Sequence, residues 1–591
     1  MRKALSLMGI LLAGAVSAQQ AADGVEPEAA GVGVFEDMSS GVTAALAAKA
    51  AGVPVVAARW MVAAANPHAV QAGADVLARG GTAADALVAV QVMLGLVEPQ
   101  SSGLGGGAFL VWYDAATGEL TTIDGRETAP LAATPRRFQD ENGEPLKFFD
   151  AVVGGRSVGV PGTPALLDAV HDRWGALDFA TLTAPAIALA EAGFSVSPRL
   201  AGLIEGDQER LGKFATTAGY FMPGGVALQA GDTLKNPAYA QTLRMLTADQ
   251  ASFYVGANAA AIVTTVNEAM DGAGLLSTVD LSIYQVKERA AVCGPYHGHQ
   301  VCGMGPPSSG AVAIGQILGM LEGYDLSAGP QDVEVRRLMG DAARLAFADR
   351  GRYLADSDFV PVPVQGLLDP AYLAQRATLL SGEGALEEAA PGKPEFDHAL
   401  NWADDQSIEL PSTSHISIVD AMGNVASMTT TIENGFGSRI MVNGYLLNNE
   451  LTDFSFRSHK DGVPIANRVE PGKRPRSSMA PTIVLKDGKP VLALGSPGGS
   501  RIIGYVAGAI VAHLDWGMDV QQAVSVPHSV NRFGTYDLEA DTAAAELEAP
   551  LSALGFEVGI RALTSGLHMI AIGEDLRGGA DPRREGIVLG E

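Results

Sequence analysis

Cysteine is almost absent from this chain, with only 2 cysteines among 591 residues. So few thiols exclude a disulfide-rich scaffold, a cysteine-based zinc site and an iron–sulfur cluster. Long hydrophobic runs are missing too, because no stretch beyond the N-terminus reaches 18 apolar residues without a charge. We therefore expect a soluble mature chain without a stable membrane anchor.

Positive charge is also scarce. Lys and Arg number 40 against 66 Asp and Glu, a net charge of −26. This balance argues against nucleic acid or an anionic membrane surface as a partner. Apolar residues, in contrast, make up 47% of the chain and charged residues only 18%, so it can bury a large core and is not disordered. The length would allow three or four domains.

Residues 1–18 have the pattern of a secretory signal peptide. Arg2 and Lys3 form a charged start, and Ala4–Val16 is an apolar stretch too short to span a bilayer. Val16-Ser17-Ala18 is a small-residue cleavage site, and no cysteine follows it to carry a lipid. The pattern predicts a periplasmic or secreted protein. A buried N-terminal helix is the alternative.

If the protein is exported, its two cysteines are in a compartment where they can form a disulfide. Cys293 and Cys302 flank His297-Gly298, which we interpret as a two-residue hairpin turn. In that register the two cysteines face each other at a non-hydrogen-bonded position, close enough for a cross-strand disulfide. An oxidising compartment favours this bond, and two free thiols are the alternative.

The predicted secondary structure changes near residue 413. Helical patterns dominate before it, residues 383–412 are loop-like and acidic, and short alternating strands with hairpin signals follow. This order predicts stacked layers of helix and sheet. The glycine cluster at 103–107 precedes a strand and opens no helix, so it is not a dinucleotide-binding turn. We interpret it as close packing beneath an active site.

The common catalytic motifs are absent, including G-x-S-x-G, H-E-x-x-H and the P-loop, and no histidine pair has metal-ligand spacing. What remains is a run of hydroxyl residues around Thr413. A threonine hydroxyl is a weak nucleophile without an adjacent base. If the chain were cut before Thr413, its new α-amine, with a pKa of about 8, would be that base. A Ser/Thr-rich strand start is the plain alternative. His415 would lie about 7 Å further along the strand, too far to be the base.

Four downstream segments favour the catalytic interpretation. Residues 429–431 end the paired strand, so a hydroxyl there can reach Thr413. Residues 447–454 place two carboxylates three positions apart, which suits an ammonium group. Residues 473–479 combine hydroxyls with cationic side chains. Residues 495–501 precede a helix, so their N–H groups can form an oxyanion hole.

In this order, the motifs resemble those of γ-glutamyltranspeptidases, the glutathione hydrolase family of N-terminal nucleophile hydrolases. The matching motifs are T-S-H-I-S at 413–417, N-N-E-L-T-D-F at 448–454, K-R-P-R-S-S-M at 473–479, G-S-P-G-G-S-R at 495–501, S-G-L-G-G-G at 102–107, D-G-R-E-T-A-P at 124–130, P-P-S-S-G at 306–310 and D-P-R-R at 581–584. The resemblance runs from about residue 50 to the C-terminus. It implies an α/β fold, a four-layer αββα sandwich formed by a large subunit (19–412) and a small subunit (413–591) of one precursor.

The resemblance also implies the chemistry. The precursor would cleave itself between Ser412 and Thr413, and the two subunits would stay together as a heterodimer. Thr413 would attack a γ-glutamyl amide, with Thr431 orienting it and the N–H groups of Gly498 and Gly499 forming the oxyanion hole. Water, an amino acid or a dipeptide would resolve the γ-glutamyl ester. No metal or organic cofactor is implied, and glutathione and related γ-glutamyl amides are the expected substrates.

The resemblance implies two sets of substrate-binding residues, one for each charged group of the substrate. Those for the α-carboxylate are Arg126, Ser477 and Ser478, and those for the α-ammonium are Glu433, Glu450 and Asp453. Many members have asparagine at the position of Glu433. Residues 455–472, which form a lid in some relatives, lack tyrosine and tryptophan here, which predicts a more open pocket. Two rival functions are a cephalosporin acylase that takes a glutaryl side chain and a non-maturing secreted binding protein.

Overall fold

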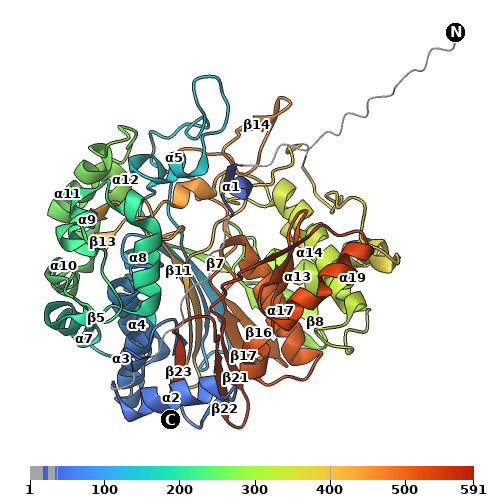
Figure 1. Cartoon of the computed structure of the whole chain (residues 1–591), viewed down its shortest axis with the longest axis horizontal. Coiled ribbons are helices and arrows are strands. Elements are labelled where there is room, and N and C mark those ends of the chain that lie inside the picture. Colours follow the sequence, from blue (N-terminus) through green and yellow to red (C-terminus); the bar gives the residue numbers. More distant parts are fainter. Residues whose placement is uncertain (1–17, 24–32, 36–37, 399–400) are drawn as a thin grey trace.

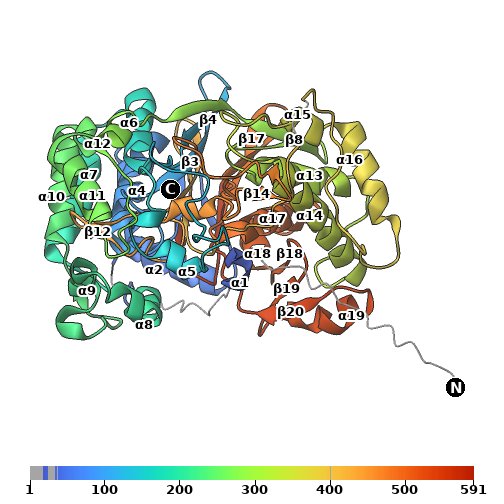
Figure 2. The same ribbon diagram turned by 90° about the horizontal axis from the view of Figure 1, so that it is seen from above.

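The computed structural model describes residues 18–23, 33–35, 38–398 and 401–591. Two seven-stranded sheets lie face to face between two helical layers (Figure 1, and from above in Figure 2). This four-layer arrangement is the predicted αββα sandwich. Of the predicted signal peptide, only Ala18 lies within the described residues. No helix in these described ranges is both long enough and apolar enough to span a bilayer.

The first sheet carries the strand that begins next to Thr413. Its strands, in spatial order, are β23 (Ile587–Gly590), β2 (Met61–Ala64), β10 (Ser414–Val419), β11 (Val425–Thr431), β3 (Gly107–Tyr113), β4 (Leu120–Gly125) and β7 (Lys287–Ala290). All neighbouring pairs are antiparallel. Most of these strands are buried along their whole length, because one face packs on helices and the other on the second sheet.

The second sheet is also antiparallel throughout. Its strands, in spatial order, are β1 (Val55–Ala57), β22 (Leu576–Ala580), β21 (His568–Ile572), β17 (Lys489–Gly495), β16 (Thr482–Lys486), β9 (His299–Gly303) and β8 (Val292–Tyr296). Both sheets therefore interleave strands that precede and follow residue 412, and side chains such as Ile483 and Ala493 fill the space between them.

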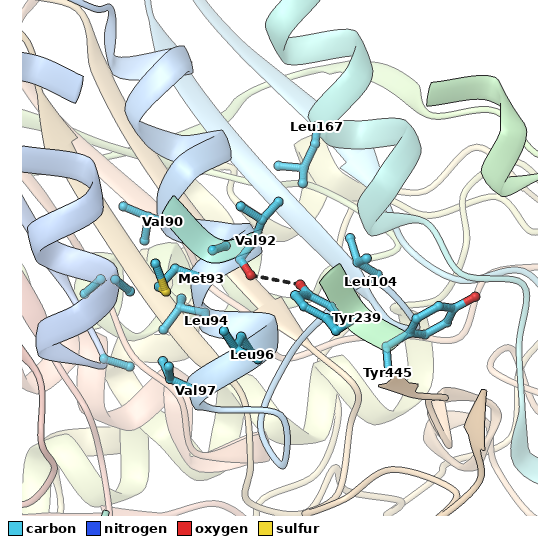
Figure 3. Close-up of a cluster of buried hydrophobic side chains, with 14 of the residues drawn as sticks. Val90, Val92, Met93, Leu94, Leu96, Val97, Leu104, Leu167, Tyr239 and Tyr445 are labelled. Carbon is cyan, nitrogen blue, oxygen red and sulfur yellow. Dashed lines mark hydrogen bonds between the residues drawn. The ribbon is translucent and has the colours of Figure 1, made fainter. Parts of the chain in front are cut away.

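One helical layer covers the first sheet. It includes α2 (Ser40–Ala50), α3 (Pro67–Ala78), α4 (Ala83–Val97), α6 (Thr163–Trp174), α7 (Phe179–Ala192), α8 (Pro198–Leu211), α10 (Pro237–Ala248) and α11 (Gly256–Asn267). Thr82 and Asp85 form a capping box that starts α4, and every residue of this helix is buried. Figure 3 shows part of its packing, where the Tyr239 hydroxyl donates a hydrogen bond of 2.8 Å to the carbonyl of Val92. That bond satisfies a buried polar group in an otherwise apolar cluster.

The other helical layer covers the second sheet. It includes α13 (Gly310–Leu321), α14 (Val333–Tyr353), α16 (Pro370–Ala377), α17 (Ile502–Leu514) and α18 (Val520–Ser525). A small third sheet, β18 (Ser529–Asn531), β19 (Tyr536–Glu539) and β20 (Val558–Arg561), lies beside this layer with α19 (Glu548–Ala553). Residues 401–412, which lead into the first strand after the predicted cut, have no regular structure.

The two cysteines are joined at the edge of the second sheet. Cys293 on β8 faces Cys302 on β9, with Cα atoms 4.1 Å apart, and their sulfurs form a disulfide. His297 and Gly298 both have positive φ, the backbone that a two-residue primed turn requires. The hairpin geometry thus brings the two side chains together.

Thiol labelling tests this disulfide. We expect that the denatured, unreduced protein takes up no thiol reagent, because both sulfurs are in the bond. After reduction, the same sample should take up two labels per chain, as counted by intact mass. Two labels before reduction would show that the cysteines are free.

Candidate active site

Thr413 lies directly opposite Thr431. Ser414 on β10 pairs with Thr430 on β11, so the antiparallel register places the residue before one strand against the last residue of the other. Their Oγ1 atoms are 3.0 Å apart, within hydrogen-bond distance. The N–H of Glu433 donates to Thr431 Oγ1 at 2.8 Å. This bond holds the Thr431 oxygen in place and leaves its proton free to reach Thr413.

The carbonyl groups of the two peptide bonds that flank Thr413 are both held by hydrogen bonds. The carbonyl of Ser412 accepts the N–H of Gly498 at 3.2 Å, and the carbonyl of Thr413 accepts Arg584 Nη1 at 3.1 Å. Thr413 has a φ of 91°, a region that β-branched residues rarely occupy. Strain of this kind costs on the order of 1–3 kcal/mol and persists only where the surrounding contacts impose it. A hydroxyl, a strained backbone φ at Thr413 and an N–H donor to the preceding carbonyl therefore meet at one point.

Two glycines allow close backbone approach at this point. A Cβ on Gly499 would lie 2.5 Å from the carbonyl oxygen of Glu409, and its φ is +58°. A Cβ on Gly106 would lie only 1.9 Å from the carbonyl oxygen of Thr431. Any other residue at either position would push the backbone away from the site. The glycine cluster at 103–107 accordingly lies beneath the Thr413–Thr431 pair, in close packing as expected.

Arg126 is paired with two of the three predicted ammonium ligands, Glu450 and Asp453. The buried guanidinium donates to the carboxylates of Glu450 and Asp453 and to the carbonyls of Pro475 and Arg476. Burial opposes the guanidinium charge, but Glu450 and Asp453 outweigh this effect and raise the pKa of Arg126. Arg126 is therefore a permanent cation in the floor of the site.

Carboxylates outnumber this cation. Burial raises the pKa of Glu433, Glu450 and Asp453 well above the ordinary range, and repulsion between neighbouring acids adds to the effect. Burial also raises the pKa of the adjacent Glu127 to about 8. A nearby ammonium group would favour the charged carboxylates and lower these raised pKa values, so this excess of acid suits a cation.

These residues surround one cavity. Its lining consists of Arg126, Glu409, Leu410, Thr413, Thr431, Glu433, Glu450, Asp453, Ser477, Ser478, Met479, Gly499 and Ile502. The predicted nucleophile and all six predicted substrate-binding residues are among them, and Gly498 adjoins it. The cavity volume is about 10 Å³. That volume holds no more than about one water molecule, because the chain segment before Thr413 occupies the space.

The structure adds residues that the sequence pattern missed. Glu409 lies in the cavity and forms an ion pair with buried Arg350 of α14. Asp23, near the N-terminus, accepts hydrogen bonds from Arg501 and Arg532 beside the Gly498-Gly499 turn. Burial opposes the charge of Asp23, but the two arginines lower its pKa to about 2. No local spacing links these residues, so only three-dimensional proximity reveals them.

Two other predictions concern nearby residues. His415 is buried and hydrogen-bonds Thr429 and Ser417 at 2.9 and 3.0 Å, and burial lowers its pKa, so it is a neutral structural group. The predicted lid segment, 455–472, contains the short hairpin of β14 (His459–Lys460) and β15 (Val463–Pro464). Its phenylalanine, Phe456, is buried and stacks on Phe138 at 4.8 Å between ring centroids.

Within the described residues, no cluster of three or more His, Cys, Asp and Glu side chains is arranged to hold a metal.

The comparison with known families agrees with this geometry. Residues 69–591 match the family model described as Gamma-glutamyltranspeptidase. The chain belongs to this family. A glutathione hydrolase proenzyme of Bacillus subtilis (strain 168) is 39% identical over 548 residues, covering 90% of this chain and 91% of that protein. Gamma-glutamyltranspeptidases are enzymes, and the curated relatives of this chain include glutathione hydrolases named as proenzymes.

Acylases share the scaffold with this family. The Acylase ACY 1 proenzyme of Pseudomonas sp. (strain SE83) is 35% identical over 546 residues, covering 90% of this chain and 94% of that protein. Among solved structures, a cephalosporin acylase from Bacillus halodurans superposes with a TM-score of 0.80 at 26% identity, covering 91% of this chain and 97% of that one. The predicted N-terminal nucleophile hydrolase fold is thereby confirmed.

Proposed function

We propose that this chain is an exported, self-processing γ-glutamyltransferase and glutathione hydrolase whose nucleophile is Thr413. The observation that carries the proposal is the Thr413 hydroxyl, 3.0 Å from Thr431 Oγ1 and next to a carbonyl that accepts the Gly498 N–H. Family membership supports the reaction type, and the cavity around this hydroxyl supports the substrate class.

Processing uses the groups around the scissile bond. Thr413 Oγ1 attacks the carbonyl carbon of Ser412, and the C–N bond breaks as the threonine nitrogen takes up the hydroxyl proton. The product is an ester between Ser412 and Thr413 Oγ1, with a free α-amine on Thr413. Water then hydrolyses the ester, leaving the Ser412 carboxylate and the original hydroxyl. The Gly498 N–H stabilises the negative oxygen in both steps.

The freed α-amine of Thr413 is the base for turnover. It takes the proton of its own hydroxyl while Oγ1 attacks the γ-carbonyl of the donor. The leaving amine takes a proton, and a γ-glutamyl ester remains on Thr413. Water resolves the ester to glutamate, and an amino acid or dipeptide amine resolves it to a new γ-glutamyl amide. Thr431 orients the nucleophile, and the N–H groups of Gly498 and Gly499 stabilise the oxyanion.

The charges of the cavity favour a donor that bears an α-ammonium. Glu450 and Asp453 share one arginine, Arg126, and Glu433 lines the same cavity, so the three acids outnumber this cation and a glutaryl group without the ammonium would leave the excess of acid uncompensated. The likeness to acylases makes glutaryl amides the second candidate. Assays with γ-glutamyl-p-nitroanilide and glutaryl-p-nitroanilide separate the two: we expect turnover of the first, and turnover of the second alone would select the acylase function.

We also propose that residues 19–412 and 413–591 remain together after the cut. Both sheets contain strands from both parts, so separating them would break each sheet. N-terminal sequencing of the exported protein tests the processing. Two chains, the smaller beginning Thr-Ser-His-Ile-Ser, would support it. One uncut chain under native conditions would favour the binding-protein alternative.

Arg126→Lys tests substrate binding. Lysine keeps the charge but cannot hold two carboxylates and two carbonyls at once, as the planar guanidinium does. We expect the KM for γ-glutamyl-p-nitroanilide to rise roughly 10- to 100-fold in the processed enzyme. Arg173→Lys, in an exposed ion pair, is the control that should keep the original KM. An unchanged KM in the Arg126 variant would exclude Arg126 from donor binding.

A further inference from the structure

Arg336 of α14 is a buried cation that lacks a counterion. Its side chain belongs to a residue that is 3% exposed, and its Nε donates to the carbonyl of Pro330 at 2.7 Å. Its Nη1 contacts the sulfur of Met339, a weak and neutral acceptor, at 4.0 Å. Its Nη2 has no hydrogen-bond partner among the described residues. None of these contacts neutralises the guanidinium, which stays charged in proteins.

The other arginines of the same helix are all paired. Arg337, Arg344, Arg350 and Arg352 form ion pairs with Glu334, Asp341, Glu409 and Asp404, respectively. Arg336 forms no ion pair in the part of the chain that the structure describes. Because a buried charge without a partner is strongly destabilising, this exception requires a counterion from outside the described residues.

The titratable groups beside Arg336 are neutral. Burial raises the pKa of the Tyr536 phenol above its ordinary value, and its hydroxyl donates to the carbonyl of Arg336 at 2.8 Å. Burial lowers the pKa of His528 well below its ordinary value, and the positive charges of Arg583 and Arg336 lower it further. Burial also lowers the pKa of Arg336 itself. The folded chain therefore supplies no negative charge at this point.

Arg336 lines a second cavity, which lies between α14, α17 and β18 and has a volume of about 20 Å³. Ser529 of β18 lines the same cavity, and its buried Oγ also has no hydrogen-bond partner among the described residues. The ring of Trp516 forms part of the wall, with its centroid 5.3 Å from the guanidinium carbon of Arg336. Met339 and Trp516 are half-buried, so a small solute can enter without unfolding of the core. The cavity thus offers a charged N–H donor and an O–H donor to one small occupant.

The volume of the cavity restricts the choice of anion. A space of this size holds about one water molecule. A halide ion is only slightly larger than water, whereas phosphate, sulfate and carboxylates have several non-hydrogen atoms and do not fit. Water itself fits but brings no charge to offset that of Arg336.

We propose that this cavity is a binding site for one halide ion, chloride in ordinary media, held by Arg336 Nη2 and Ser529 Oγ. The ion neutralises Arg336 and joins α14, α17 and β18. The site shares no lining residue with the cavity around Thr413, and it stands apart from the proposed catalysis.

Thermal unfolding in two salts tests the site. At equal concentration, sodium chloride should give a Tm roughly 2 °C higher than sodium gluconate, whose anion is too large for the cavity, and the difference should saturate with concentration. Arg336→Gln removes the charge and should abolish the difference between the salts. An equal difference in Arg336→Gln, or no difference in the unaltered protein, would overturn the proposal.

Two further variants make the result specific. Ser529→Ala removes one donor and should raise the chloride concentration at half-saturation several-fold, which keeps the test available if Arg336→Gln does not fold. Arg352→Gln is the matched control, because Arg352 lies on the same helix but pairs with Asp404 at 29% side-chain exposure. It should keep the full response to chloride. An unchanged half-saturation in Ser529→Ala would exclude Ser529 from the site.

Bromide identifies the occupant directly. In crystals soaked in sodium bromide, we expect an anomalous-scattering peak in contact with Arg336 Nη2 and Ser529 Oγ, and no such peak in Arg336→Gln crystals. Water density alone in this cavity would overturn the proposal. A bromide peak without any difference between the salts in solution would show binding at crystal concentration only, and would overturn it as well.

Discussion

Replacement of Thr413 with alanine should leave the exported protein as one uncut chain without γ-glutamyl turnover. Oγ1 of Thr413 is the attacking atom in both processing and catalysis, and alanine removes it without disturbing the surrounding strands. The Gly498 N–H would still contact the Ser412 carbonyl, but no hydroxyl would be in position to attack that carbonyl. Intact mass and gel electrophoresis of the purified protein measure the outcome.

Two further variants make this result specific. Thr413→Ser keeps the hydroxyl and should still be cut. Ser414→Ala removes the neighbouring hydroxyl, which accepts a hydrogen bond from Ser102 Oγ at 3.3 Å, and this variant should be cut normally. Normal processing of Thr413→Ala would show that another group is the nucleophile, whatever the enzyme does with γ-glutamyl amides.

Thr431→Val should slow both processing and turnover. Valine has nearly the same shape but cannot accept the N–H of Glu433 or bond to the Thr413 hydroxyl. We expect kcat to fall on the order of 100-fold, the typical effect of losing one positioned hydrogen bond to a reacting group. The KM should change little, because the charged residues that bind the donor are untouched. Steady-state kinetics with γ-glutamyl-p-nitroanilide separate the two constants.

The neighbouring threonine supplies a matched control. Thr430 is buried on the same strand, but its Oγ1 has no hydrogen-bond partner among the described residues. Thr430→Val makes the same change of atoms and should leave kcat within about threefold, because no bond is lost. If Thr430→Val and Thr431→Val lowered kcat equally, the effect would come from packing, and Thr431 would have no role in orienting the nucleophile.

The local pattern of the chain was sufficient to predict that a hydroxyl of residues 429–431 lies within reach of Thr413. The turn at 420–424 sets the register of β10 and β11, and strand geometry then places Thr413 against Thr431. In the same way, the turn at His297-Gly298 determines that Cys293 faces Cys302. The alternation of helices and strands predicted the layers because each element must bury its apolar face against another. These features depend on short separations along the chain.

The ion pair between Glu409 of the cavity and Arg350 could not be predicted in this way. Glu409 and Arg350 are 59 residues apart, and Arg350 and Ser478 are 128 apart, so their meeting depends on how α14 packs beside the second sheet. In the sequence, Glu409 is one acid among many in a loop and Arg350 one of several arginines in a helix. Water would separate two such charges in an open chain, whereas the folded core excludes water and makes their pairing obligatory. The sequence by itself therefore determined the strands, the hairpins and the placing of Thr413 beside Thr431, while the tertiary structure decided which charges face one another around this pair.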